Sequence, residues 1–555
     1  MLSRHLARIG LLALTSAAVV HGQSTLRSYG NFLPSNDAGY HVLGLDDYDG
    51  DGVPEHAISY KLGAGNGGFP GAVEVYSGAD GSLIRRHQGG IFGVSNDARL
   101  GDGLALLGDL DGDGYRDYAV AAPSDDASGA QGSVHVHSGR TGVRLWQVRG
   151  DVSTGQVDTP NAGPDLDGDG IDEVFVRANS RNSLAYSGAN GALLRTFADT
   201  TFSFGAAIVS PGDLNGDGTP DLLVAAPSGN NGSGFVRILS GATTQPLAPA
   251  LLGPAGFATF GASLLALGDL NGDGIEEVAI GAPYEGAGTV RIYDVVTRTV
   301  LALLDGATFG AGSSSGTAVF FGASIAKVGD TNGDGVPDLA IGAYYDVAFN
   351  TGALYVVSMS DWSLIFRKRS TQRENYAFSV SSAGDTDGDG LAEVLVGAPF
   401  ALNGANGRVD IVEWRSLGAT FCSSTPSSTG ATPDLAAFGS PVAADNDLTL
   451  RMTGAPNGGF GLFAASRLAM PLGIPLAGGG VLCLGGAPLR FTYTLGMIDA
   501  GTLRARLDLT AFPEPPTYQV AVMAGDVWYF QAWFRDSIGG VATSRLSTAI
   551  QVDFE

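Results

Sequence analysis

Apolar residues recur along most of this chain in short runs that Gly, Pro and Asp separate. The clearest unit holds four such runs, at residues 261–268, 277–281, 288–294 and 299–304, and none of them has the period of a helix. Short runs rich in β-branched residues predict β-strands. Because the four-strand unit recurs about every 55 residues, the pattern indicates an internal repeat.

Seven four-stranded units predict an all-β fold whose main part is a seven-bladed β-propeller. Only the neighbouring blades can bury the apolar faces of a blade, so the ring has to close. Residues 24–29 align with fourth strands such as 83–87. We expect them to complete the last blade, because an unpaired strand edge is costly.

The repeat stops after about residue 417, and further alternating runs, such as 448–452 and 528–534, predict a small β-sandwich. The expected division of the chain is 1–22 for a signal peptide, 23–418 for the propeller, 419–434 for a linker and lead-in loop, and 435–555 for the C-terminal β-sandwich domain.

A nine-residue acidic loop joins the first and second strands of every unit. In the second unit, alternate side chains of a tightly curled loop point inward, so Asp109, Asp111, Asp113 and Asp117 can converge with the carbonyl of Tyr115. Such an oxygen-only cage suits a hard cation, calcium above all. The pattern therefore predicts up to seven calcium ions. The predicted ligands are Asp47, Asp49, Asp51, Val53, Glu55, Asp109, Asp111, Asp113, Tyr115, Asp117, Asp165, Asp167, Asp169, Ile171, Glu173, Asp213, Asn215, Asp217, Thr219, Asp221, Asp269, Asn271, Asp273, Ile275, Glu277, Asp330, Asn332, Asp334, Val336, Asp338, Asp385, Asp387, Asp389, Leu391 and Glu393.

An EF-hand begins with similar residues, but its twelfth position is a bidentate Glu and its flanks are helices. Here the twelfth position is always apolar and β-branched, and it lies in a predicted strand. The twelfth residues are Ile58, Val120, Val176, Val224, Ile280, Ile341 and Val396. The loops therefore join strands, and the sequence argues against an EF-hand.

Phe-Gly pairs precede three of the loops, at Phe204, Phe260 and Phe321, and Gly-Ala-Pro follows two loops, at 281–283 and 397–399. This pattern resembles the FG-GAP repeat, the unit of the seven-bladed propeller in integrin α-subunits and in many bacterial secreted proteins. The resemblance implies a calcium-dependent propeller that acts in binding or adhesion. No inserted domain with its own metal site interrupts the repeats, so integrin-type ligand binding does not carry over to this chain.

Residues 1–22 have the charged start and the apolar run of a secretory signal peptide, and no later stretch is apolar enough to predict a membrane span. We therefore expect a secreted or extracellular protein, with attachment to the cell surface as an alternative. The net charge of -25 argues against nucleic acid as a partner. In an exported chain, Cys422 and Cys483 are expected to form a disulfide.

The motifs favour a binding or adhesion module for protein or glycan ligands, and they identify no catalytic residues. The alternatives are a polysaccharide-active lyase or hydrolase and a structural cell-surface or matrix protein. His135 and His137 share a strand face and could bind a metal, but their counterparts differ in other repeats, which favours variable strand positions over a metal site. The nine-residue acidic loops, named the cation loops, leave one face of the ring, and variable loops on the opposite face display the expected ligand-binding residues. The alternative is that these aromatic residues cap the central channel. They are Phe69, Tyr284, Tyr345 and Phe349.

Overall fold

The computed structural model divides the chain into two compact units, Thr25–Trp414 and a C-terminal unit that begins at Arg415. The residues that it describes are 25–30, 36–62, 71–89, 98–126, 131–312, 319–332, 335–346, 351–370, 372, 374–388, 390–400, 407–413, 417–439, 443, 446, 448–476, 480–498, 501–514, 518–538 and 541–554. These residues form strands and two short 3-10 helices, and none of them is in an α-helix or in a helix fit to cross a membrane.

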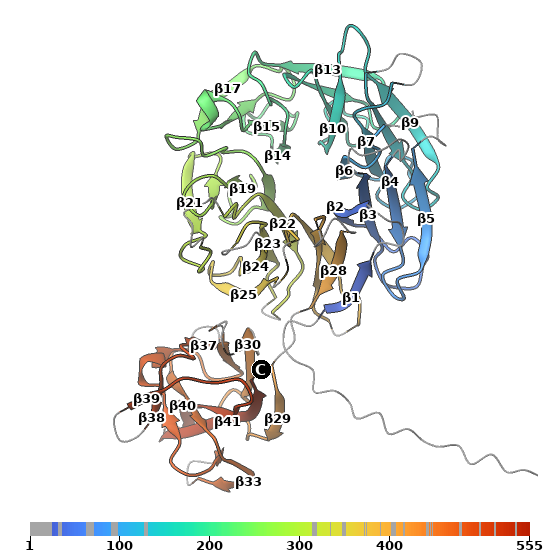
Figure 1. Ribbon diagram of the computed structural model, residues 1–555. Helices are drawn as coiled ribbons and strands as arrows, with labels where there is room; N and C mark the ends of the chain where they lie inside the picture. Colours follow the sequence, from blue (N-terminus) through green and yellow to red (C-terminus); the bar gives the residue numbers. More distant parts are fainter. Residues whose placement is uncertain are drawn as a thin grey trace, which may run out of the picture. The chain divides into compact units, whose positions relative to one another are not determined.

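The first unit is a seven-bladed propeller of four-stranded antiparallel sheets (Figure 1). Blade 1 contains β2 (Asn36–Gly44), β3 (His56–Leu62), β4 (Ala72–Tyr76) and β5 (Leu83–Gln88). Blade 2 contains β6 (Gly103–Leu106), β7 (Tyr118–Ala122), β8 (Ser133–His137) and β9 (Arg144–Arg149). Blade 3 contains β10 (Val157–Ala162), β11 (Val174–Ala178), β12 (Asn182–Tyr186) and β13 (Leu193–Ala198). Blade 4 contains β14 (Ile208–Gly212), β15 (Asp221–Ala226), β16 (Phe235–Leu239) and β17 (Pro246–Leu252), with the 3-10 helix η2 (Asn230–Gly232).

Blade 5 contains β18 (Leu264–Gly268), β19 (Glu277–Ala282), β20 (Thr289–Asp294) and β21 (Thr299–Asp305). Blade 6 contains β22 (Ser324–Val328), β23 (Asp338–Ala343), β24 (Ala353–Ser358) and β25 (Leu364–Arg369). Blade 7 contains β26 (Ser379–Gly384), β27 (Glu393–Ala398) and β28 (Arg408–Val412), and its outermost strand is β1 (Thr25–Gly30). The seven-bladed fold class expected from the repeat is therefore confirmed.

The N-terminal strand closes the ring, as the unpaired-edge argument predicted. β1 pairs antiparallel with β28, with Tyr29 opposite Val409, so the first and last segments of the propeller share one sheet. The apolar cores lie between blades. One core joins Ala57 and Val75 of blade 1 to Val120 of blade 2, and the other described cores likewise join residues of two adjacent blades. Closure therefore buries faces that a single blade would leave in water.

Side chains on the outermost strand fasten four blades to the blade that follows. Each donates a hydrogen bond to a backbone carbonyl in the turn between the third and fourth strands of the next blade. These latches, donor first, are Arg27 to Gly78, Arg85 to Gly139, Trp146 to Gly188 and Arg195 to Gly241. The register places residues without a side-chain donor at the same position of blades 4, 5 and 6, namely Ala248, Ala302 and Phe366.

The C-terminal unit has two main sheets, ordered β29-β41-β40-β32-β35 and β30-β31-β37, which share one apolar core around Trp528, Phe530 and Leu450. Its strands are β29 (Ala419–Cys422), β30 (Asp434–Gly439), β31 (Leu448–Thr453), β32 (Phe460–Ser466), β33 (Ala469–Pro475), β34 (Val481–Leu484), β35 (Leu489–Arg490), β36 (Gly496–Met497), β37 (Leu503–Leu507), β38 (Phe512–Glu514), β39 (Tyr518–Val520), β40 (Val527–Ile538) and β41 (Val541–Asp553), with the 3-10 helix η5 (Thr492–Thr494). The linker was expected at 419–434, but its first four residues form strand β29, which pairs with β41.

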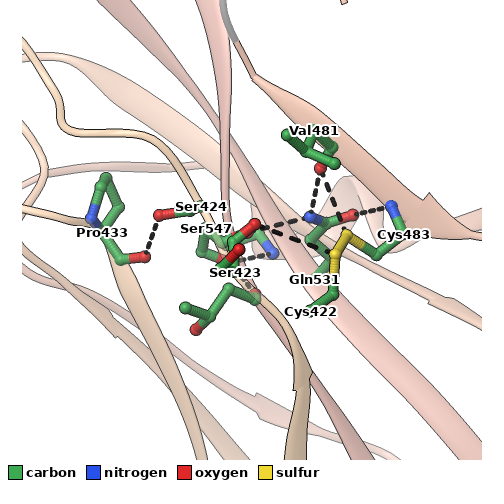
Figure 2. The surroundings of a disulfide bond; sticks show 10 residues. Cys422, Ser423, Ser424, Pro433, Val481, Cys483, Gln531 and Ser547 are labelled. Atoms are coloured by element: carbon green, nitrogen blue, oxygen red, sulfur yellow. Dashed lines mark hydrogen bonds between the residues drawn. A yellow bond between two sulfur atoms is a disulfide. The ribbon is translucent and has the colours of Figure 1, made fainter. Parts of the chain in front are cut away.

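A disulfide joins β29 to β34 (Figure 2). The Cα atoms of Cys422 and Cys483 are 6.2 Å apart, and Cys483 is fully buried. The buried amide of Gln531 accepts from the Cys483 N–H at 3.0 Å and donates to the carbonyls of Val481 and Ser547 at 2.8 and 2.9 Å. The disulfide therefore fixes the β33–β34 hairpin to β29, and the hydrogen bonds of Gln531 hold the same hairpin to β40.

Candidate metal centres and binding face

The cation loops all connect the inner strand of a blade to its second strand, so they emerge on one face of the ring. The first carboxylate of each loop accepts hydrogen bonds from backbone N–H groups later in the same loop. Asp109 accepts from the N–H groups of Gly112, Asp113 and Gly114 at 2.8, 3.1 and 2.8 Å. Gly112 and Gly114 have φ of +77° and +91°, and only glycine adopts such angles readily. The loop sequence thus holds its own carboxylates in place.

The ninth-position carboxylate closes each loop from below. In all seven loops it accepts a hydrogen bond from the backbone N–H of the second loop residue, at 2.8 Å for Asp117 and Leu110 and at 2.9 Å for Glu173 and Leu166. The other pairs are Glu55 with Tyr48, Asp221 with Leu214, Glu277 with Leu270, Asp338 with Thr331, and Glu393 with Thr386. These ninth residues are buried. Each loop therefore has one carboxylate at its base, shielded from water.

Two of these basal carboxylates retain oxygens without partners. Among the described residues, no hydrogen bond reaches Oε1 of Glu55 or Oε2 of Glu173. Burial raises the pKa of Glu55 and that of Glu173 to about 7, and the charges of the other loop aspartates add to the shift. Burial likewise raises the pKa of Asp117 to about 6. A buried, unpartnered carboxylate oxygen within an acidic loop fits a bound cation, which would stabilise the ionised form.

The structure brings many of the predicted ligands together. Among the residues that the structure describes, acidic oxygens within 4.8 Å of one another form five groups that could hold a metal ion. Four of them contain predicted ligands alone: Asp47, Asp49, Asp51 and Glu55; Asp109, Asp111 and Asp117; Asp165, Asp167 and Glu173; and Asp385, Asp387 and Glu393. Several described acidic ligands predicted from sequence fall outside these groups, including those of the fourth and sixth loops: Asp113, Asp169, Asp213, Asp217, Asp221, Asp269, Asp330 and Asp338. Asp334 and Asp389 lie outside the described residues, as do the predicted ligand-face residues Phe69 and Phe349.

The fifth group contains a residue that the loop motif did not identify. Asp294 lies with Asp273 and Glu277, and it is the last residue of β20, the third strand of its blade. Its carboxylate accepts from the N–H and the hydroxyl of Thr297 at 2.9 and 2.6 Å, so it also caps a turn. Most other repeats have Ser at this position, for example Ser240. Alignment of the repeats would have revealed this exception.

The turns between third and fourth strands lie beside the cation loops. The second oxygen of Asp117 accepts from the Gly139 N–H at 2.8 Å, and that of Asp221 accepts from the Gly241 N–H at 3.0 Å. A cavity of about 390 Å³ lies at this end of inner strands β2, β6, β22 and β26. Its charged lining groups are the Asp46–Arg116 ion pair, Asp47 and Lys327. This face of the ring is therefore polar and built from repeated parts.

His135 and His137 lie between blades rather than at an acidic loop. His137 packs on His87 of blade 1 with ring centroids 4.1 Å apart, and all three histidines are buried. His135 Nε2 is 2.9 Å from the Ser133 hydroxyl, and His137 Nδ1 is 3.1 Å from the Gly142 carbonyl. Burial lowers the pKa of His135 to about 3 and that of His137 to about 4. These contacts agree with a packing role for neutral imidazoles.

The opposite face carries a continuous set of aromatic rings, which we name the aromatic arc. It runs over blades 5, 6, 7 and 1, at the starts of inner strands and the ends of second strands. Its members are Tyr40, Tyr284, Phe320, Tyr344, Tyr345, Phe378 and Phe400. Along the arc, ring centroids are 4.6 Å apart for Tyr284 and Phe320, 4.7 Å for Phe320 and Tyr344, 5.0 Å for Tyr344 and Phe378, and 4.9 Å for Phe378 and Tyr40. The remaining two members each pack on a ring of this series, Tyr345 on Phe320 and Phe400 on Phe378.

This face also holds every exposed Phe or Tyr side chain of the described propeller. They are Phe202, Phe257, Tyr284 and Phe400, which are 62%, 77%, 48% and 44% exposed. The expectation from sequence placed Tyr284 and Tyr345 here but missed the other members of the arc. Position in the repeat could have identified three of them. Phe320 directly precedes a Phe-Gly pair, and Tyr40 and Phe378 directly follow the two residues that replace this pair in their own repeats.

Four segments of the chain match models of one repeat family. Residues 165–224 match the FG-GAP-like repeat, and residues 260–293, 321–357 and 377–412 match the FG-GAP repeat. The chain is an FG-GAP repeat protein. The matched segments of this FG-GAP repeat protein contain its third to seventh cation loops.

Integrin α-subunits are relatives of this FG-GAP repeat protein. It is 35% identical to integrin alpha-7 of Homo sapiens over 158 residues, which are 27% of this chain and 13% of the integrin. It is 40% identical to integrin alpha-4 of Xenopus laevis over 153 residues, 25% and 14% of the two chains, and 30% identical to integrin alpha-5 of Xenopus laevis over 226 residues, 37% and 20%. The matches thus span 13–20% of the relatives' lengths. The bacterial origin implied by the resemblance stays a prediction.

Proposed function

We propose that this FG-GAP repeat protein is a secreted, calcium-stabilised binding module that recognises a protein or glycan ligand through the face opposite its cation loops. The observation that carries the proposal is the repeated acidic loop with its buried basal carboxylate. A metal-free loop of this kind keeps several like charges close together and leaves buried oxygens of Glu55 and Glu173 without partners. A divalent cation would offset both costs.

Calcium is the cation that these loops suit best. Every side-chain donor is an oxygen, and calcium accepts six to eight oxygen ligands in a flexible arrangement. In each loop, the side chains at positions one, three, five and nine would bind the ion together with the carbonyl at position seven. Magnesium requires a stricter octahedral set and retains several waters, which a preformed acidic loop serves less well.

Secretion is supported by the sequence of residues 1–22, which lie outside the described residues, and by the Cys422–Cys483 disulfide. Disulfides persist in oxidising compartments and are rare in a reducing cytosol. Processing of the exported protein between Gly22 and Gln23, read by mass spectrometry of the intact mature chain, is the expected result.

The binding face is proposed from the contrast between repeated and variable segments. The loops opposite the cation loops differ among blades and carry the exposed aromatic residues, with Tyr284 and Tyr345 among the arc. Loops on a rigid scaffold commonly carry recognition, and aromatic anchors supply much of the binding energy. Calcium would act on binding through the rigidity of the ring, because the cation loops lie on the other face.

The test is a screen of the calcium-loaded protein against glycan and matrix-protein arrays, with Tyr284→Ala/Phe400→Ala as the variant. We expect at least one specific ligand, and we expect the double variant to lose it while its calcium content stays unchanged. Retention of all ligands by the variant, or the absence of any ligand, would refute the proposed binding face. Product formation from a bound polysaccharide would instead support the lyase or hydrolase alternative.

A further inference from the structure

The aromatic arc presents more than apolar surface. Four of its seven members are tyrosines, and among the described residues no hydrogen bond engages the hydroxyls of Tyr40, Tyr284, Tyr344 and Tyr345. Each hydroxyl can donate one hydrogen bond and accept others. The arc therefore offers ring surface and polar groups to the same ligand. An apolar peptide side chain would use only the rings.

The charged groups beside the arc neutralise one another. Next to Tyr284, the carboxylate of Glu285 receives two hydrogen bonds from the Arg291 guanidinium, at 2.5 and 2.7 Å. Asp346, which follows Tyr345, pairs with Arg369 at 3.0 Å.

The remaining two pairs lie near the other end of the arc. Glu374, whose carbonyl accepts from the Phe400 N–H, pairs with Arg408 at 2.7 Å. Lys61 lies 3.9 Å from the ring centroid of Tyr40 and pairs with Asp102 at 2.7 Å. Asp102 also pairs with Arg99, and Arg408 also lies 3.4 Å from Asp410, so the one added basic group and the one added acidic group offset each other. The arc therefore gives no net electrostatic advantage to an anion or a cation.

We infer that the aromatic arc binds an uncharged glycan, with sugar rings stacked on its aromatic side chains. One face of a pyranose ring carries mainly C–H groups, which pack on an aromatic ring, while its hydroxyls exchange hydrogen bonds with groups such as a tyrosine hydroxyl. Half-buried rings fixed by their neighbours lose little conformational entropy on binding. Single-stranded nucleic acid also stacks on aromatic platforms, but it needs a basic groove, and this chain carries a net charge of -25. The inference rests on the proposed binding face.

The test uses the full-length, calcium-loaded protein and two kinds of soluble polysaccharide. Xylan, galactomannan and mixed-linkage β-glucan are the neutral set, and alginate and polygalacturonate are the charged set. Affinity electrophoresis followed by titration calorimetry compares the wild type with three variants. Tyr284→Ala/Phe400→Ala removes rings, Tyr344→Phe/Tyr345→Phe removes hydroxyls and keeps the rings, and Phe460→Ala changes a 45% exposed aromatic side chain in the C-terminal unit.

We expect at least one neutral polysaccharide to bind, with at least a tenfold loss of affinity in the alanine variant and a severalfold loss in the phenylalanine variant. Phe460→Ala should bind as the wild type does. Binding of charged polysaccharides alone, or an alanine variant that binds neutral polysaccharide normally, would overturn the inference. A protein ligand lost in the alanine variant but kept in the phenylalanine variant would also overturn it and would leave the proposed binding face standing. Absence of any ligand would refute both.

Discussion

The two faces of the propeller are built from opposite kinds of sequence. On one face, each blade contributes the same nine-residue acidic loop, and most blades place a Ser-Gly turn beside it. On the other face the connecting loops differ from blade to blade, and they hold the exposed aromatic residues of the described propeller. Blades 5, 6, 7 and 1 carry the aromatic arc there, whereas blades 2 to 4 have residues such as Ser124 and Ser228 after their second strands.

This difference separates what the fold requires from what it displays. A feature that recurs in every blade serves a need that every blade has, such as closing a tight acidic hairpin. A feature confined to four blades serves no such shared need, and exposure of large aromatic side chains has a cost in water. The comparison therefore supports the proposal that the repeated face serves stability and the variable face serves recognition.

The largest difference in stability between changes on the two faces should come from removing one carboxylate of a cation loop. Asp109→Ala should lose one calcium ion and destabilise the calcium-loaded propeller by about 4 kcal/mol, since one site at a hundredfold excess contributes about 2.7 kcal/mol and lost backbone hydrogen bonds about 1 kcal/mol. Urea unfolding and elemental analysis measure both effects. Asp80→Ala is the control, because Asp80 lies in an exposed turn on the same face and accepts from the Ser82 N–H at 2.7 Å. Equal destabilisation by both changes would contradict a special role for the loop.

Acidification should weaken calcium binding on the repeated face, because protons compete with calcium for the basal carboxylates. In the metal-free protein the folded-state pKa of Glu55 and Glu173 is about 7, above the usual value of a Glu carboxyl, so these groups favour folding below pH 4.5 and lose that contribution as the pH rises through 7. Calcium needs the ionised form, so its stabilising effect should be full above pH 7 and should shrink as the pH falls. We expect at least about tenfold weaker calcium binding at pH 5.5 than at pH 8.

That comparison is made as the difference between calcium and chelator at each pH. The buried histidines, whose pKa values are lowered, destabilise both forms alike as the pH falls below 6.5, so their contribution cancels. Calcium-induced stabilisation that is the same at pH 5.5 and pH 8 would show that these carboxylates do not bind the ion.

Changes on the variable face should affect stability less. Tyr284→Ala/Phe400→Ala should cost about 2 kcal/mol or less, because full burial of one large side chain contributes about 1.5–3 kcal/mol and both of these are nearly half exposed. Calcium stoichiometry should be unchanged. Loss of bound calcium in this variant, measured by elemental analysis, would mean that the two faces are not independent.

The smallest effect concerns one backbone position. Ala377 has a φ of +60°, where the equivalent residues Gly261 and Gly322 have +90° and +85°. Glycine adopts this conformation at lower cost, so Ala377→Gly should stabilise the protein by about 0.5–1 kcal/mol. Urea unfolding measures the change, and Ala340→Gly, in the interior of β23, is the control that should destabilise.

The sequence predicted the repeated half of the molecule well. A fixed spacing of acids and glycines recurs seven times, so it identified the loops, the strands that flank them and the N-terminal strand that closes blade 7. Because the unit recurs, the repeats can be aligned with one another, and the alternation of apolar residues then predicts the strands. The latches were not predicted, because only four of the seven blades have a side-chain donor at this position and each donor acts on the neighbouring blade.

The variable face was predicted only in outline. Tyr284 and Tyr345 were placed on it, but Phe320, Tyr344 and Phe378 were not, because they become neighbours only when the ring curves and brings separate blades together. Contact between blades depends on tertiary geometry that no local pattern encodes. The supposed linker failed at 419–422 for a similar reason, since β29 finds its partner β41 near the other end of the C-terminal unit.

Differential scanning calorimetry with calcium and with chelator tests the central claim most directly. Several sites that each contribute about 2.7 kcal/mol should raise the propeller midpoint by about 10 °C, since 1 kcal/mol shifts a domain of 150–250 residues by about 2–4 °C and a larger domain such as this propeller by less. The C-terminal unit, which lacks the loop motif, should melt at the same temperature in both conditions. A propeller midpoint that does not change on removal of calcium would contradict the account.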